Sequence, residues 1–428
     1  MKYYNLSIIL ILIFLFSEVY SYGQNDTEKG KHVGPEWIQK MLINDGVLSA
    51  PSHRFTKKYD QYKHSSSIRG MFFEGLPYKE KETKVFCWYG VPKTLKQGEK
   101  APAVVLVHGG GGTAFHQWVQ KWNNRGYIAI SIALEGQVPG DMILDKNGQN
   151  KHPSFEFSGP SRIGFFNDVN DHNLQDQWFY HAVADIMKAT SLLTSFPEVD
   201  AEKIGITGIS WGGILTNVVT GIDNRYAFAI PVYGCGYLHE TPLYKKIIDH
   251  LKPSQQIFYM ENWEPSLYVP LHKQPTLFVN GTNDMHFTMN SFTKTFAAST
   301  NEKYLRIELE MKHGHSQGWD PKEIYNFADY VLKDGLKPVE ISYVSISKKK
   351  SVLYRYTGEV KEVYLYYTTD VADWGDTNYK WTEIPVSFNA TENTIKATLP
   401  NNTKVYFVNT ISTEGLISSS KMRFVSEN

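Results

Sequence analysis

The chain has 428 residues, enough for two or three folding units and a sizeable buried core. Lys plus Arg and Asp plus Glu are equal at 44 each, so the charge balance gives no reason to expect nucleic acid or an anionic membrane surface as a partner. Neutral polymers and small molecules remain open. The two cysteines, Cys87 and Cys235, are expected to be small buried side chains, and no zinc-binding pattern is present.

The first 23 residues have the layout of a secretory signal peptide. Lys2 precedes an apolar run over residues 6–16, and the small residues Ser21 and Gly23 allow cleavage after position 23. A membrane span needs roughly 20 apolar residues, more than this run supplies, so stable membrane insertion is not expected. The sequence therefore predicts export to the periplasm or the extracellular space.

Residues 24–60 form an N-terminal extension without a clear secondary-structure signal, and residues 61–337 have the pattern of an α/β domain. The segments 67–77 and 83–92 are two strands joined by a polar turn, which predicts an antiparallel edge. Short apolar runs then alternate with helical periodicity, which predicts a parallel sheet covered by helices. The apolar runs are 101–109, 126–134, 203–208, 226–234, 274–281 and 304–311.

Two helices are well delimited by sequence. Residues 176–196 place apolar side chains on one helical stripe. The segment 320–335 has Asp320 at the expected N-cap, Pro321 at the first helical position and Glu323 in a capping box, with a glycine beyond its end. After it, residues 338–428 show short alternating runs separated by Gly, Asn, Asp and Pro, which predicts a small all-β sandwich.

The segment Thr207–Gly213 reads TGISWGG and puts Ser210 at the centre of a G-x-S-x-G motif. It lies where a predicted strand ends and a helix begins, the context in which such a serine is an exposed nucleophile. A glycine-rich turn without catalytic function is the alternative, and the neighbouring motifs decide between them.

A run of glycines, HGGGG, follows the first parallel strand. Backbone N–H groups in such a run can point at the oxygen on which negative charge develops during acyl transfer. We expect Gly110 and Gly111 to form an oxyanion hole with the N–H of Trp211. A phosphate-binding loop is the alternative, but the run lacks the Gly-Lys-Ser/Thr ending and no acidic residue follows at dinucleotide spacing, so no cofactor is expected.

An acid and two histidines follow the serine in chain order. Asp284 comes just after the predicted strand 274–281, where its carboxylate can orient a histidine. His313 and His315 both follow the last strand, and either can act as the base. A His-x-His pair also binds metals, but no third ligand has convincing spacing, so no metal is expected.

These motifs resemble those of secreted α/β hydrolases of the acetylxylan-esterase and dienelactone-hydrolase-like group, which are related to the catalytic domain of prolyl oligopeptidases. The resemblance covers residues 68–337 and rests on HGGGG, PEVDAEKIGITGISWGG, VNGTND and KHGHSQGW. It implies an α/β-hydrolase fold and the roles of nucleophile, base and orienting acid for Ser210, His315 and Asp284. His315 is preferred to His313 because KHGHSQG resembles the K-x-G-H-x-x-G of prolyl oligopeptidases. One departure is ALEGQ, which stands where relatives often have an Asp-x-x-Gly loop.

The connection over residues 136–177 is long for a strand-to-helix loop, and it either covers a substrate pocket or packs on the scaffold. Candidates for contact with a sugar ring are Trp118, Trp263 and Phe165. For Trp118 a core position is the favoured alternative, because it is spaced four residues from Trp122 and aromatic residues at helical spacing are usually buried.

Together these features predict an exported serine esterase that removes acyl groups, most simply acetyl groups, from a carbohydrate or a small-molecule ester. A peptidase related to prolyl oligopeptidases is an alternative, although about 70 residues before the hydrolase region are few for their propeller. A second alternative is a non-catalytic hydrolase scaffold that binds glycans.

Overall fold

The computed structural model describes residues 33–425, except 146, 147, 149, 171, 371–373 and 375–379. The predicted signal peptide and residues 24–32 therefore lie outside the described part. Within the described part, no helix combines the length and the apolar character that a membrane crossing requires.

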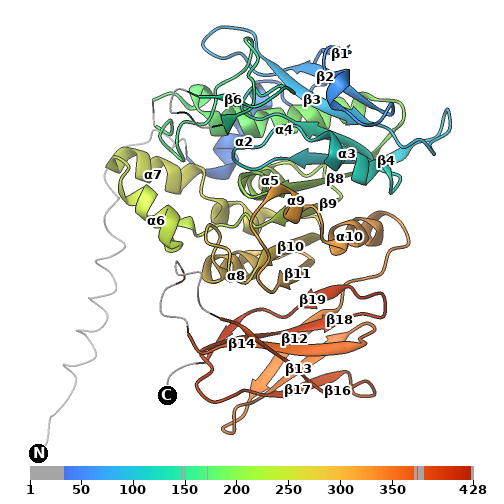
Figure 1. The fold of residues 1–428 in the computed structure, drawn as a ribbon. Coiled ribbons are helices and arrows are strands. Elements are labelled where there is room, and N and C mark those ends of the chain that lie inside the picture. Colours follow the sequence, from blue (N-terminus) through green and yellow to red (C-terminus); the bar gives the residue numbers. More distant parts are fainter. Residues whose placement is uncertain are drawn as a thin grey trace, which may run out of the picture. The chain divides into compact units, whose positions relative to one another are not determined.

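A nine-stranded sheet, ordered β1-β2-β3-β5-β4-β8-β9-β10-β11, forms the centre of the α/β region (Figure 1). The strands from β5 to β11 in this order are parallel, and β1, β2 and β3 add an antiparallel edge. Both the parallel sheet and the antiparallel edge were predicted from the sequence. The strands are β1 (His53–Thr56), β2 (Ile68–Glu74), β3 (Lys84–Gly90), β4 (Ala101–Val107), β5 (Ile128–Ile132), β8 (Val199–Ile209), β9 (Phe228–Val232), β10 (Thr276–Gly281) and β11 (Lys303–Glu308).

The parallel strands are continuous apolar runs because both of their faces are buried. Their carboxyl ends share one edge of the sheet with the amino ends of β1 and β3, since β3 runs antiparallel to β5 and pairs Cys87 with Ile132. This edge carries the candidate active site, and below it is called the active-site edge.

Helices cover the sheet (Figure 1). Trp122 on α3 contacts Tyr325 on α10, with ring centroids 4.8 Å apart, and α4 packs on α5. The helices are α2 (Gly34–Asn44), α3 (His116–Asn123), α4 (Trp178–Ser195), α5 (Trp211–Ile222), α6 (Pro242–Asp249), α7 (Pro253–Asn262), α8 (Met289–Ala298), α9 (His315–Gly318) and α10 (Lys322–Leu332). Short 3₁₀ turns are η1 (Asp60–Tyr62), η2 (Leu174–Asp176), η3 (Leu238–Glu240), η4 (Pro265–Leu267) and η5 (Val269–Leu271).

The start of α10 differs from the prediction. Pro321 occupies the N-cap position and makes no side-chain cap, so Asp320 is not the N-cap. The carboxylate of Glu323 does not close a capping box, because it accepts hydrogen bonds from the backbone N–H of Ile417 at 2.8 Å and from Nε of Arg306 at 3.2 Å. Long-range partners therefore replace the local ones that the sequence pattern suggested.

The long connection after β5 contains the two-stranded ribbon β6 (Ile143–Leu144) and β7 (Asn150–Lys151). It packs on the scaffold at two places. Phe155 lies on Phe72 of β2, with ring centroids 4.6 Å apart, and Phe166 contacts Tyr259 of α7 at 4.2 Å.

Residues after α10 form antiparallel sheets, ordered β12-β13-β17-β16 and β15-β14-β18-β19, with β20 paired to β18. Buried side chains of both sheets, including Tyr354, Leu365, Ile395 and Val408, form one apolar cluster, as expected of a sandwich. Gly34–Asn428 clusters as one compact unit, so the boundary at 337/338 stays a prediction. The strands are β12 (Glu340–Ile346), β13 (Ser351–Thr357), β14 (Glu362–Thr368), β15 (Thr382–Pro385), β16 (Phe388–Asn389), β17 (Thr394–Thr398), β18 (Val405–Ile411), β19 (Ile417–Ser419) and β20 (Arg423–Phe424).

The outer edge of β11 is covered by side chains of this β-rich region. The N–H of Ile307 donates to Oγ of Ser419 at 2.7 Å, and its carbonyl accepts from Nδ2 of Asn409 at 3.0 Å. Asn409 and Ser419 also share a hydrogen bond of 2.6 Å. These bonds satisfy backbone groups that an edge strand would otherwise leave open.

Candidate active site

Ser210 lies in a strained turn between β8 and α5. Its backbone has φ 59° and ψ −116°, a conformation that is costly for a residue with a side chain and typical of a nucleophile elbow. A Cβ on Gly208 would collide with the carbonyl of Gly212, and one on Gly212 would collide with the carbonyl of Val107. The glycines of the motif are therefore required by close backbone packing around the serine.

His313 lies between the serine and the acid. Its Nε2 is 2.9 Å from Oγ of Ser210, and its Nδ1 is 2.6 Å from Oδ2 of Asp284. Oδ1 of Asp284 accepts hydrogen bonds from the backbone N–H groups of His286 and Phe287, at 2.8 and 2.9 Å. These bonds fix the buried carboxylate and leave its other oxygen to hold the imidazole.

The preference for His315 over His313 is wrong in this structure. His315 is the first residue of α9, and its Nε2 accepts a hydrogen bond of 3.0 Å from the backbone N–H of Gly109. Burial lowers the pKa of His315 to about 4, so the ring is neutral at physiological pH and suited to accept that bond. The K-x-G-H resemblance pointed to His315, the histidine after Gly314. The histidine that faces Ser210 is His313, directly before Gly314.

The glycine run after β4 leaves two N–H groups available. Gly109 donates to His315, and Gly112 donates to the carbonyl of Gly109 at 3.1 Å. Within the described residues, Gly110 and Gly111 donate to no protein acceptor. Trp211 is the first residue of α5, so its N–H has no partner inside the helix. The three groups predicted for the oxyanion hole are thus free to bind an oxygen, and their role stays a prediction.

His108 supports the start of this run. Its Nε2 accepts from the backbone N–H of Leu134 at 3.0 Å, and its Nδ1 is 2.7 Å from the carbonyl of Gly109. Burial lowers the pKa of His108 to about 3, which keeps the ring neutral. The tautomer with a proton on Nδ1 satisfies both bonds.

Of the three candidate sugar contacts, two are buried elsewhere. Trp118 is 1% exposed and packs on Trp319, and Trp263 is 0% exposed and donates its Nε1–H to Gln177. Neither ring can therefore contact a sugar: Trp118 takes the core position that its spacing from Trp122 favoured, and Trp263, just after α7, was wrong as a candidate. Phe165 is half-buried and lies against Trp211, with ring centroids 6.0 Å apart, so it remains a candidate.

Sequence analysis missed several side chains next to the site. The ring of His286, in the loop after β10, lies 4.7 Å from that of His313, and the ring of Tyr233, just after β9, lies 4.5 Å from it. The guanidinium of Arg162 is 4.7 Å from the indole of Trp211, and its Nε is 3.4 Å from Glu135. Only the position of His286, two residues after Asp284, was a visible signal.

Within the described residues, no group of three or more His, Cys, Asp or Glu side chains is arranged to hold a metal ion.

The indole of Trp211 is 4% exposed, because rings from the long connection, α4 and α6 surround it. These rings belong to Phe165, Phe166, Trp178, Phe179 and Tyr244.

Comparison with known proteins finds a family match and related folds. Residues 50–258 match the family model acetyl xylan esterase (AXE1). Asp284 and His313 lie beyond the matched residues. The chain is also 24% identical over 258 residues to dipeptidyl-peptidase 4 of Giardia intestinalis, covering 56% of this chain and 30% of that relative. It thus spans about a third of the curated relative that it matches.

Solved structures share the fold. The acetyl xylan esterase from Paenibacillus sp. R4 aligns with a TM-score of 0.53 and 18% identity, covering 74% of this chain and 99% of that one. Acetyl xylan esterase 1 from Thermoanaerobacterium sp. JW/SL YS485 aligns with a TM-score of 0.55 and 15% identity, covering 72% and 100%. Residues 50–258 therefore match the acetyl xylan esterase (AXE1) family model, and the solved structures show that the chain shares their α/β-hydrolase fold; these findings support a carboxylic-ester hydrolase of the serine hydrolase type.

Proposed function

We propose that this protein is an exported serine esterase that removes acetyl groups from a carbohydrate through a Ser-His-Asp acyl-enzyme mechanism. The observation that carries the proposal is the continuous chain from Asp284 through His313 to Ser210, with distances of 2.6 and 2.9 Å. The family match over residues 50–258 supports the ester as substrate.

Acylation starts at Oγ of Ser210, which attacks the ester carbonyl carbon while Nε2 of His313 takes the hydroxyl proton. The carbonyl π electrons move to the oxygen, which the N–H groups of Trp211 and Gly110 stabilise. The tetrahedral intermediate collapses, the sugar oxygen leaves with its bond pair, and the proton on His313 passes to that oxygen. The carboxylate of Asp284 stabilises the imidazolium throughout.

Deacylation repeats the sequence with water as the nucleophile. His313 removes one water proton as the oxygen attacks the acyl-serine, and the same N–H groups hold the second oxyanion. Collapse breaks the ester bond to Ser210, whose oxygen recovers the proton. The products are acetic acid and the free serine enzyme.

The carbohydrate substrate and the export are supported by different features. Residues 1–23 have the signal-peptide layout, and the acetyl xylan esterases among the structural neighbours have names that place their substrate in xylan. An exported enzyme meets polymers outside the cell.

The test uses the purified mature protein, a fluorophosphonate probe and p-nitrophenyl esters of acetate, butyrate and octanoate. Labelling at Ser210, acetate preferred to longer acyl groups, and release of acetate from acetylated xylan are expected. Absence of labelling together with unchanged turnover in Ser210→Ala would refute the mechanism.

A peptidase is the second candidate, because the 24% identical relative is a dipeptidyl-peptidase. A serine hydrolase site can cleave amides as well as esters, so the geometry fits both. Cleavage of dipeptide p-nitroanilides with proline at the second position, without acetate release from xylan, would favour the peptidase.

A further inference from the structure

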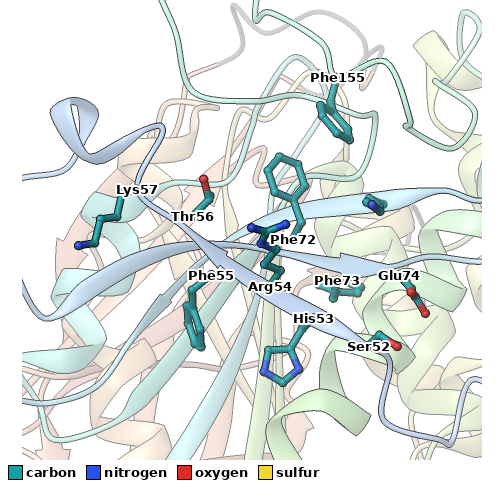
Figure 2. Close-up of a pocket in the computed structure, with 11 residues that line it drawn as sticks. Ser52, His53, Arg54, Phe55, Thr56, Lys57, Phe72, Phe73, Glu74 and Phe155 are labelled. Carbon is teal, nitrogen blue, oxygen red and sulfur yellow. The ribbon is translucent and has the colours of Figure 1, made fainter.

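A cavity of about 480 Å³, whose lining residues are drawn in Figure 2, lies at the antiparallel end of the nine-stranded sheet. Its volume is within the range of small-ligand pockets. The walls come from β1, β2, the start of β3 and the long connection after β5. The lining residues are Ser52, His53, Arg54, Phe55, Thr56, Lys57, Phe72, Phe73, Glu74, Lys84 and Phe155.

The charged groups of this cavity are mostly positive. Arg54, Lys57 and Lys84 are exposed cations, and Glu74 is the single carboxylate in the lining. Within the described residues, none of the three cations forms an ion pair. Unpaired cations at the mouth of a cavity favour a ligand with negative charge.

Two aromatic rings add an apolar surface to the same cavity. Arg54 and Phe72 are paired across β1 and β2, so their side chains share one face of the sheet. Phe155 of the long connection packs on Phe72, and Figure 2 shows these two rings on the opposite side of β1 from His53 and Phe55. A ligand that contacts both Arg54 and the rings needs an anionic group, such as a carboxylate, beside an apolar face.

The strand register relates the cavity to the nucleophile. Along one row across the sheet, Gly208 is aligned through β4, β5 and β3 with Met71 of β2. Four strand spacings separate β8 from β2, which is about 19 Å. The amino end of β1 and the carboxyl end of β2, which line the cavity, lie on the active-site edge, so this part of the cavity is on the same edge of the sheet as Ser210.

One segment of chain reaches both places. The connection after β5 brings Arg162 and Phe165 to Trp211, and its Phe155 to Phe72. The backbone N–H of Phe155 donates to the carbonyl of Gly136 at 2.8 Å, which holds Phe155 close to the start of the connection. A polymer lying along this connection would contact both sites.

From these observations we propose that the cavity lined by Arg54, Lys57, Phe72 and Phe155 is a binding site for an acidic glycan, a chain bearing uronic acid residues. A uronic acid combines a carboxylate, which Arg54 and Lys57 bind, with the apolar C–H face of a sugar ring, which lies on Phe155. The site would hold a polymer whose acetylated part reaches Ser210, and in this respect it rests on the proposed function.

Affinity gel electrophoresis of the full mature chain carrying Ser210→Ala tests binding without turnover. The probes are glucuronoxylan, neutral arabinoxylan and poly-L-glutamate. We expect glucuronoxylan to retard the protein more strongly than either of the others, and added salt to weaken that retardation. The double variant Arg54→Gln/Lys57→Gln and the single variant Phe155→Ala should each weaken binding about tenfold.

Matched controls are Lys348→Gln/Lys349→Gln, which removes two exposed charges in the turn after β12, and Phe424→Ala, which removes an exposed ring. Both should bind like the parent. Equal loss in the control and the Arg54/Lys57 variant would overturn the site, as would equal retardation by arabinoxylan. Equal retardation by poly-L-glutamate would overturn the glycan assignment, because carboxylates alone would then suffice.

The binding result and the proposed function can fail separately. In chains with Ser210 intact, Arg54→Gln/Lys57→Gln should hydrolyse p-nitrophenyl acetate at the parental rate, since the changed residues are about 19 Å or more from the nucleophile. Glucuronoxylan binding without ester hydrolysis would refute the esterase and leave the glycan site in place. Ester hydrolysis without selective glucuronoxylan binding would do the reverse.

Discussion

The backbone N–H of Gly109 donates a hydrogen bond of 3.0 Å to Nε2 of His315. The bond ties the first residue of α9 to the glycine run that presents Gly110 and Gly111. His315 therefore holds the glycine run in position. The hydroxyl of Ser210 is hydrogen-bonded to His313 instead.

His315→Ala should lower kcat for p-nitrophenyl acetate by on the order of tenfold to a hundredfold, less than loss of an oxyanion donor itself. The reason is that Gly109 loses its acceptor and the neighbouring N–H groups lose their fixed direction. His315→Gln keeps an acceptor and should recover much of the rate. Because the pKa of His315 is lowered to about 4, neither variant should move the kcat–pH profile above pH 5. A variant that shifts that profile would contradict the positioning role.

Asp284→Asn should reduce kcat roughly 10⁴-fold while changing KM little, because an amide can no longer hold the imidazole as an Nδ1–H donor and stabilise its charge. His313→Ala should cost at least as much. Steady-state kinetics with p-nitrophenyl acetate measure both. His250→Gln, at an exposed histidine just after α6, is the matched control and should keep the parental rate. A milder effect of His313→Ala than of His315→Ala would reverse the assignment made here.

Much of the fold was predictable because its signals are local. Buried parallel strands are continuous apolar runs. The G-x-S-x-G motif needs its glycines because backbone groups pack closely around the serine. The choice between His313 and His315 was not predictable, because both share one loop and only the spatial position of Ser210 separates them. The predicted capping box of α10 was wrong for a related reason. The carboxylate of Glu323 accepts a hydrogen bond from the backbone of Ile417, which is distant in sequence.

The substrate candidates show the same limit. Tryptophan is a residue type that often stacks on sugar rings, which made Trp118 and Trp263 candidates. Whether such a ring is buried or exposed depends on tertiary packing, and here both rings are buried. His286 and Tyr233 reach the ring of His313 from separate segments, and no spacing in the sequence joins them.

Gly212→Ala should destabilise the chain severely, by several kcal/mol or to the point of misfolding, because the added Cβ collides with backbone carbonyls of Val107 and His108 that cannot move away. Gly98→Ala is the matched control, as its Cβ would meet nothing within 4 Å and only its φ of 84° carries a penalty of about 1 kcal/mol. Urea unfolding followed by circular dichroism compares them. Equal midpoints would mean that the elbow tolerates a side chain.

Asp185 on α4 should make the protein less stable as the pH rises. Burial raises the pKa of this carboxyl to about 8 in the folded state, against about 3.9 when unfolded, and its Oδ1 has no partner among the described residues. Between these values the folded state binds the extra proton, so the free energy of unfolding falls by up to about 1.4 kcal/mol per pH unit and levels off above pH 8.

Asp185→Asn removes this dependence. Its melting temperature should therefore decline less between pH 5 and 9 than that of the parent, while the exposed control Asp334→Asn follows the parent curve. Differential scanning fluorimetry across that range is sufficient. Parallel curves for all three proteins would show that Asp185 is ionised at neutral pH.

The β-rich region should stabilise the hydrolase region by covering the edge of β11. Asn409→Ala/Ser419→Ala leaves the N–H and carbonyl of Ile307 without their partners at 2.7 and 3.0 Å, which should cost about 2–4 kcal/mol. A lower melting temperature and a tendency to aggregate are expected, because an open edge strand pairs with other chains. Activity toward p-nitrophenyl acetate at 25 °C should persist, since among the described residues the side chains of Asn409 and Ser419 bond to Ile307 and to each other, and not to Ser210, Asp284 or His313.

The control for this pair is Asn401→Ala/Thr413→Ala, which truncates exposed side chains in the turns before and after β18. If this control melts as low as the Asn409/Ser419 variant, the loss comes from the sheets themselves and not from the edge of β11. Removal of residues 338–428 extends the test, because it opens the whole edge at once. That shortened chain should be recovered mainly as aggregate, whereas a soluble, monomeric and active product would show that β11 needs no cover and that the β-rich region serves another purpose.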